Sequence, residues 1–310
     1  MRCSLKFGVI VTALFSCATP LFAESHLPNT SAAWTWPPYI AVPLFATALL
    51  YILGIARMPR MVSPVQYLRA ACFAAGWLSL LIALDSPIHE ISEQLFWVHM
   101  TQHEILMLVS APLLVVSEPA ATLLWALPES WRSPIARLGK LSLLRRTWLL
   151  ISAPVAAWLL HAIALWAWHA PRLFVAALES DAIHAAQHIS FLGTALVFWW
   201  TLFHGHGGRL GYGAAILYVF TTAIHTSVLG AWLTFSPQAW YAPYVSTAPL
   251  RNLTAIQDQQ LGGLIMWIPA GTLLTMVALV LLAKWIRHSE LRWEYTKTAA
   301  LLRASQGAAE

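Results

Sequence analysis

The chain has 310 residues, of which 59% are hydrophobic and 10% are charged, and its mean hydropathy is +0.64. Because soluble globular proteins carry about 25% charged residues, this composition excludes a disordered chain, a fibrous protein and an ordinary soluble enzyme. Three cysteines are too few for a disulfide framework. The net charge is +5, and in a membrane protein the position of the basic residues indicates first how the chain is oriented across the membrane. We therefore expect an all-α, polytopic membrane helical bundle.

The first 23 residues have the pattern of a secretory signal peptide. Arg2 and Lys6 flank the start of an apolar run over residues 7–15, and small residues precede a plausible cleavage point after Ala23. An uncleaved anchor is the alternative. In either case residues 24–38 form an external N-terminal segment, and the chain enters the membrane from outside.

Seven apolar stretches are each close to the roughly 20 residues that a helix needs to cross a bilayer. They are Tyr39–Ile55, Tyr67–Leu84, Leu95–Val116, Trp148–Trp168, Ile183–Phe203, Tyr212–Phe235 and Gln259–Ile286. Arginine and lysine gather in the first, third and fifth connecting loops and in the tail, so the positive-inside rule places these in the cytoplasm. We predict a seven-span membrane domain over residues 39–288 and a cytoplasmic tail over residues 289–310, in a bacterial inner membrane.

Histidines gather in one layer of this predicted bundle, near its outer face. His99 and His103 are four residues apart on the third span, and His184 and His188 repeat that spacing on the fifth. Residues at i and i+4 share a helix face, so each pair can hold one ion between two imidazoles. His225 lies about 15 Å below the outer end of the sixth span, at 1.5 Å per residue.

These residue types predict a metal site that faces outward. Imidazole suits copper, zinc, iron and nickel, whereas thioether favours Cu(I), and methionines lie nearby on the third span. We therefore predict copper, held by His99, His103, His184 and His188 with a contribution from His225. Packing is the simpler role for Met100 and Met107 themselves. Glu104 is a carboxylate deep in the third span, and the sequence leaves three roles open for it. It could orient an imidazole on a neighbouring helix, relay protons, or form a hydrogen-bonded contact in the core.

Several other functions are compatible with the same residues. The sequence lacks a P-loop, a His-Glu-x-x-His motif and paired cysteines, which excludes an NTP-driven pump, a zinc metalloprotease of that class and a thiolate shuttle. We therefore do not expect an enzyme. Three alternatives stay open: a haem protein with histidines on facing helices, a copper or proton permease, and a metal-free assembly scaffold.

Three blocks of the sequence resemble a known family. They are His99-Met-Thr-Gln-His103 with Ala111-Pro112, then His184-Ala-Ala-Gln-His188 with Phe198-Trp199-Trp200, then residues 258–269, Asp-Gln-Gln-Leu-Gly-Gly-Leu-Ile-Met-Trp-Ile-Pro. Together they resemble the CtaG-type, Bacillus-like multi-span cytochrome c oxidase assembly factors over residues 35–288.

This resemblance implies a role in maturing a haem-copper oxidase, at the copper-insertion step, with an oxidase subunit or an assembly intermediate as partner. Two positions depart from the expected pattern. Glu104 stands where an apolar residue, often Met, is expected, which changes the charge beside the predicted site. Glu118 stands where Gly is expected, at the inner end of the third span.

Overall fold

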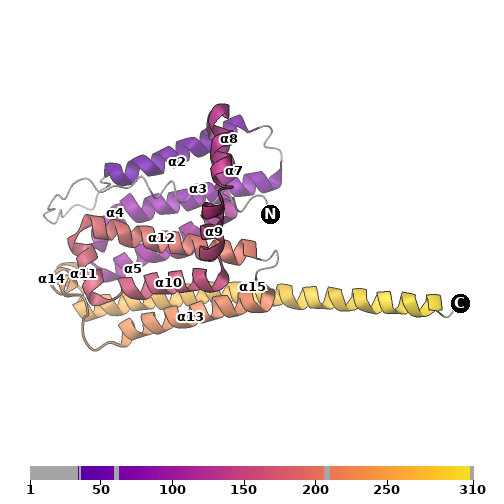
Figure 1. Cartoon of the computed structure of the whole chain (residues 1–310). Coiled ribbons are helices and arrows are strands. Elements are labelled where there is room, and N and C mark those ends of the chain that lie inside the picture. The colour runs from indigo at the N-terminus through magenta and orange to yellow at the C-terminus, as the bar shows by residue number, and fades with distance from the viewer. Residues whose placement is uncertain (1–33, 35, 59–62, 206–209, 308–310) are drawn as a thin grey trace.

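The computed structural model describes residues 34, 36–58, 63–205 and 210–307, and this part of the chain is helical, without strands. The long helices lie side by side and form one bundle (Figure 1). The expectation of an all-α membrane bundle is confirmed. The predicted signal peptide lies outside the described residues.

The predicted count of seven spans is not confirmed. Five helical stretches are long and apolar enough to cross a membrane: α2 (Pro38–Arg57), α3 (Pro64–Asp85), the continuous helix Phe96–Ser117, α13 (Tyr212–Phe235) and α15 (Ala255–Gly307). A sixth arises if α9 (Ser142–Ile151) and α10 (Pro154–Trp168), which are bent by 69°, count as one broken span.

The remaining predicted span is α12 (Asp181–His204), which has 24 residues but is not among these apolar helices. It lies inside the bundle, and half of its residues are buried, including His184, Gln187 and His188. Because neighbouring helices rather than lipid cover such a helix, it can carry polar side chains that would be costly against lipid.

The break between α9 and α10 follows from Pro154. Proline lacks an N–H and disfavours the helical conformation of the residue before it, and Ala153 is extended with φ −67° and ψ 138°. α9 therefore ends at Ile151, and the apolar α10 starts afresh at Pro154. The predicted single span Trp148–Trp168 is thus divided near its N-terminal end.

The helix Phe96–Ser117 contains a wider turn next to its histidines. It comprises α5 (Phe96–Glu104), a π-helical segment η1 (Ile105–Ser110) and α6 (Ala111–Ser117). The Ala111 N–H bonds to the Leu106 carbonyl, which frees the Met107 carbonyl, and the Trp199 indole of α12 donates to that oxygen at 2.9 Å. Such π segments are frequent at functional sites.

The two ends of the bundle differ. At one end lie the short helices α4 (Pro87–Ser92), α11 (Pro171–Glu179) and α14 (Ala242–Thr247), followed by η3 (Ala248–Arg251) (Figure 1). The other end carries α7 (Pro119–Ala126) and α8 (Glu129–Leu138), and from it α15 projects well beyond the bundle. The predicted tail is therefore a continuation of the last helix as far as residue 307.

Candidate metal site

The N-terminus of α5 is held in place by one buried carboxylate. Asp258 of α15 accepts the Phe96 N–H at 2.8 Å and the Trp97 N–H at 3.0 Å, and it is fully buried. The first N–H groups of a helix have no partner within the helix, and a carboxylate there also opposes the positive end of the helix dipole. Because His99 lies within the first turn of α5, this cap positions it.

A glycine lets α15 approach closely enough for that cap. A Cβ added to Gly262 would lie 2.4 Å from Phe96 Cδ1, which no side chain can occupy. Tyr241, which precedes α14, stacks on the same Phe96 ring, with centroids 4.9 Å apart. The block of residues 258–269 therefore fixes the histidine helix from behind and contributes no histidine of its own.

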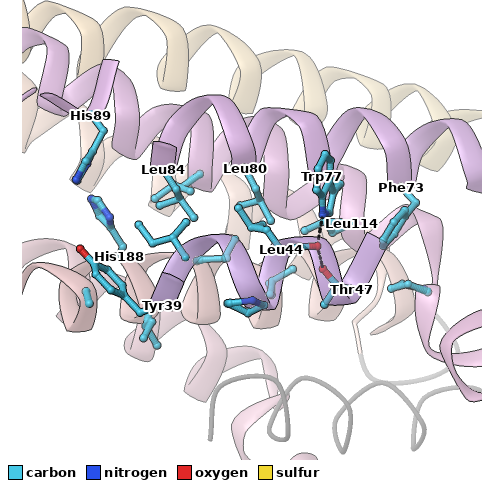
Figure 2. A pocket seen from close by; sticks show the side chains of 18 of the residues that line it. Tyr39, Leu44, Thr47, Phe73, Trp77, Leu80, Leu84, His89, Leu114 and His188 are labelled. Atoms are coloured by element: carbon cyan, nitrogen blue, oxygen red, sulfur yellow. Dashed lines mark hydrogen bonds between the residues drawn. The ribbon is translucent and has the colours of Figure 1, made fainter. Parts of the chain in front are cut away.

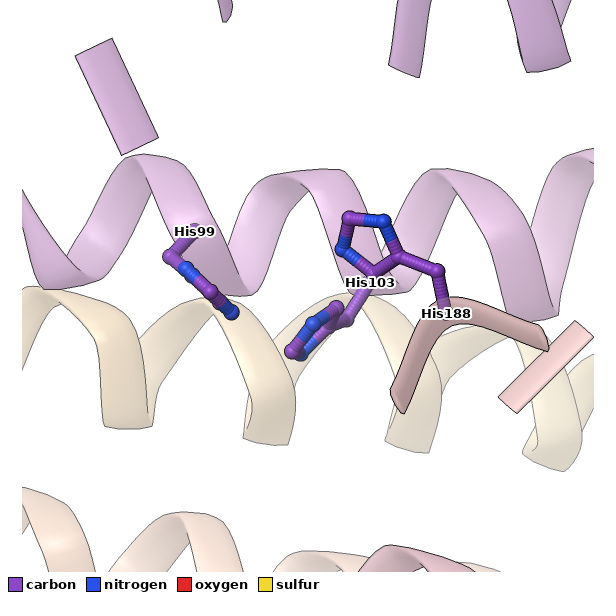
Figure 3. Close-up of side chains that lie close together, drawn as sticks. All are labelled: His99, His103 and His188. Carbon is purple, nitrogen blue, oxygen red and sulfur yellow. The ribbon is translucent and has the colours of Figure 1, made fainter. Parts of the chain in front are cut away.

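Three of the predicted ligands meet inside the bundle. His99 and His103 come from α5 and His188 comes from α12, and the three side chains turn toward one another (Figure 3). One ring nitrogen from each lies within 4.8 Å of the others. Nitrogens that share a metal at about 2.0 Å each lie at most about 4 Å apart, so small rotations of the rings would close the site around one ion.

His184 is the fourth predicted ligand in this cluster. Its ring centroid lies 4.3 Å from that of His188 and 5.2 Å from that of His99, and it stacks on the latter. All four imidazoles are buried, with exposed fractions of 8% or less. The two i, i+4 pairs therefore face each other between α5 and α12, whereas their spacing predicts only that each pair shares a helix face.

Five ring nitrogens of these four histidines lack hydrogen-bond partners among the described residues. His99 Nε2, both ring nitrogens of His103, His184 Nε2 and His188 Nε2 are buried without a hydrogen bond to any described residue. A buried polar group without a partner costs about 1–3 kcal/mol. Such a concentration in one place is what a site for a cation with nitrogen ligands requires.

Tyr244 sets the tautomer of His99. The Tyr244 hydroxyl donates to the Ser92 carbonyl at 2.9 Å and lies 3.4 Å from His99 Nδ1. Burial, with a smaller contribution from Asp258, raises the pKa of Tyr244 well above its ordinary value, so the hydroxyl stays protonated. Because the Tyr244 hydroxyl donates its hydrogen to the Ser92 carbonyl, its oxygen accepts from His99, so the proton of the imidazole lies on Nδ1. His99 Nε2 then has a free lone pair for a metal.

His89 is a neighbour that sequence reasoning missed. α4 places its ring 5.4 Å from that of His184, stacked on it, and its Nδ1 lies 3.1 Å from Gln102 Nε2. Burial lowers the pKa of His89, and the nearby carboxyl groups offset this effect only in part. No pattern in the sequence predicts this contact, since α4 is a helix of only 6 residues that begins at Pro87.

His169 and Met100 extend the cluster on its other side. The His169 Nδ1–H donates to the Leu165 carbonyl at 2.6 Å, and its Nε2 lies 3.4 Å from Met100 Sδ. Because a carbonyl only accepts, the proton is on Nδ1, so an imidazole lone pair faces a thioether. Two acceptors in contact are what a soft cation would join. The sequence analysis does not include His169 among the predicted ligands, and the predicted layer of histidines near the outer face is the pattern in which it could have been sought.

His225 and Glu104 lie apart from this cluster. The described ring contact of His225 is with Trp158, at 5.4 Å, and its role as a ligand stays a prediction. Glu104 lines a separate small cavity of about 20 Å³ with His161 and Thr222, which is room for about one water molecule.

Comparison with known proteins finds one matching family and two similar relatives. The family described as cytochrome c oxidase caa3 assembly factor (Caa3_CtaG) matches residues 49–288. Two uncharacterized proteins, from Mycobacterium bovis and Mycobacterium tuberculosis, are each 26% identical to it over 261 residues, which cover 82% of this chain and 40% of each relative. The chain thus spans less than half the length of these relatives. No solved structure matches it.

Proposed function

Because the chain belongs to the cytochrome c oxidase caa3 assembly factor family, we propose that it binds Cu(I) among its histidines and passes the ion to an oxidase subunit or an assembly intermediate. The observation that carries the proposal is the convergence of buried ring nitrogens without partners from α5 and α12. Copper is the cargo in this proposal, and His99, His103, His184 and His188 hold it.

The surroundings of the four histidines favour Cu(I) over zinc. Structural zinc sites are commonly built from thiolates and imidazoles in a closed tetrahedron, whereas this cluster continues into the contact between Met100 Sδ and His169 Nε2. Thioether is a ligand that selects Cu(I). Neutral imidazole and thioether also hold the ion without a thiolate, which suits reversible transfer.

The charge distribution supports an outward-facing site. The histidine end of the bundle carries Asp85, Glu90, Glu93 and Asp181, whereas the helices at the other end carry most of the lysines and arginines. The latter include Arg132, Arg137, Lys140, Arg145, Arg146, Lys284 and Arg287. The positive-inside rule then orients the histidine end toward the outside.

A metal-loading experiment tests the site. The purified protein is loaded with Cu(I) under reducing conditions and desalted, and its copper content and optical spectrum are compared with those of the double variant His99→Ala/His188→Ala. The matched control is His204→Ala, which removes a histidine at the opposite end that pairs with Glu118. Near-stoichiometric copper is expected in the wild type and the control, and little in the double variant.

Three results would count against the proposal. Equal copper in all three proteins would place the ion elsewhere. A Soret band lost in the double variant would replace the copper site by a haem site. Oxidase copper content that is unchanged in cells carrying the double variant would remove the delivery role even if the ion binds.

A further inference from the structure

An elongated cavity runs from the histidine end into the bundle between α2, α3 and α12. Its volume is about 270 Å³, close to the lower end for small-molecule sites. Its wall on α12 extends from Asp181 to Leu196, a rise of about 22 Å at 1.5 Å per residue. Figure 2 shows its side chains in a row from His89 to Phe73.

The polar groups of this cavity gather at one end. Tyr39, His89, Asp181, His184 and His188 line the head of the cavity, and the rest of the wall is almost entirely aliphatic and aromatic. His184 and His188 are ligands in the proposed copper site, so Tyr39, His89 and Asp181 are the polar groups at this end that remain for a ligand of the cavity.

The two polar side chains farther along the wall are already satisfied. Thr47 Oγ1 and Trp77 Nε1 both donate to the Leu44 carbonyl, each at 2.8 Å (Figure 2). The cavity is therefore an apolar channel with a hydrogen-bonding head, which suits an amphipath with one long tail.

The charge of the cavity lining disfavours amphipaths with an anionic head. Its described residues include one carboxylate, Asp181, and no lysine or arginine. A phospholipid phosphate or the propionates of a haem would therefore be repelled by the exposed Asp181 carboxylate and would find no cation in the lining to pair with. A transmembrane helix, about 10 Å across, is too wide for this volume.

We propose that this cavity binds a membrane quinone, with its ring among Tyr39, His89 and Asp181 and its isoprenoid tail along α2, α3 and α12. The quinone carbonyls accept hydrogen bonds from the tyrosine hydroxyl and an imidazole N–H. In the quinol form, the hydroxyls donate to the carboxylate or to an imidazole lone pair. The inference goes beyond the proposed copper function and does not depend on it.

Two neighbouring substitutions on α2 test the tail channel. Thr47→Trp fills the channel about 12 Å along the helix from Tyr39, and the hydroxyl that it removes bonds only within its own helix. Ala46→Trp is the matched control, because Ala46 is exposed and does not line the cavity. The protein in detergent is incubated with decylubiquinone and desalted, and the retained quinone is extracted and quantified.

About one quinone per chain is expected in the wild type and in Ala46→Trp. Affinity should fall about tenfold in Thr47→Trp, the scale of an overpacking penalty. Tyr39→Phe, at a half-exposed side chain that does not threaten folding, should weaken binding severalfold through one lost hydrogen bond. Copper loading should be unchanged in Thr47→Trp, so failure of this inference and failure of the copper proposal give different results.

Equal quinone retention by Thr47→Trp and Ala46→Trp would overturn the inference. So would a stoichiometric phospholipid in the extract that decylubiquinone does not displace, because the cavity would then hold an acyl chain.

Discussion

Replacement of Asp258 by Asn tests how the histidine helix is positioned. The carboxylate accepts two backbone N–H groups, at 2.8 and 3.0 Å, in a fully buried place. Asparagine has one acceptor oxygen, so its amide N–H₂ would face one of the two backbone donors. That donor loses its bond at a cost of about 1–3 kcal/mol, and loss of the negative charge at the helix N-terminus adds about 1 kcal/mol. Asp258→Asn should therefore lower the free energy of unfolding by about 2–4 kcal/mol.

The measurement is an SDS titration of the purified protein in mixed micelles, followed by far-UV circular dichroism. Asp181→Asn is the matched control, since Asp181 lies in the first turn of the other histidine helix but is exposed. It should change stability by less than about 0.5 kcal/mol. Copper affinity should fall with Asp258→Asn, because the first turn of α5 carries His99. A stability equal to that of Asp181→Asn would refute the capping argument.

Three further predictions concern other parts of the bundle and use the same titration. Trp199→Phe should cost about 1–3 kcal/mol, because it leaves the Met107 carbonyl without its donor; a neutral result would mean that the π segment finds another partner. Glu118 has φ 44°, so Glu118→Gly should relieve about 1 kcal/mol of backbone strain. This gain should offset the loss of the ion pairs with Arg69 and His204 and leave the stability nearly unchanged. Glu118→Val loses the ion pairs and keeps the strain, so it should be clearly destabilising. Gly263→Ala should cost about 1–3 kcal/mol, since its Cβ would lie 2.4 Å from an atom of the facing helix. Gly193→Ala, which meets no atom within 4 Å, should be neutral or slightly stabilising.

The helical architecture and the centre of the site follow from local patterns in the sequence. Hydropathy locates the lipid-facing helices, and the i, i+4 spacing of His99 with His103 and of His184 with His188 places each pair on one face. The φ of Glu118 also gives the physical reason why Gly is expected there: the backbone is left-handed at the start of α7. These features depend on residues close in the sequence, which is why they can be predicted.

The remaining features depend on contacts between distant segments. His89 and His169 come near the cluster only because α4 and the end of α10 pack against α5 and α12. α12 is less apolar than a lipid-facing span, which its burial against neighbouring helices permits. The division of Trp148–Trp168 is local by contrast, because Pro154 within that stretch starts the new helix. Asp258 belongs to a recognisable block, but its hydrogen bonds to Phe96 and Trp97 are made across 162 and 161 residues.

Because its ligands are neutral, we expect the proposed site to prefer a monovalent ion to a divalent one. The clustered ligands His99, His103 and His188 are all neutral when they bind a metal, so the full charge of the ion is buried with them. The idealised cost of burying a unit charge is about 20 kcal/mol, and it grows with the square of the charge, so it is about fourfold larger for a divalent ion. Ag(I), a soft monovalent ion, should therefore displace Cu(I) from the loaded protein, whereas Zn(II) at the same concentration should not. Displacement by Zn(II) as effective as by Ag(I), measured as released copper, would show that the site does not select by charge.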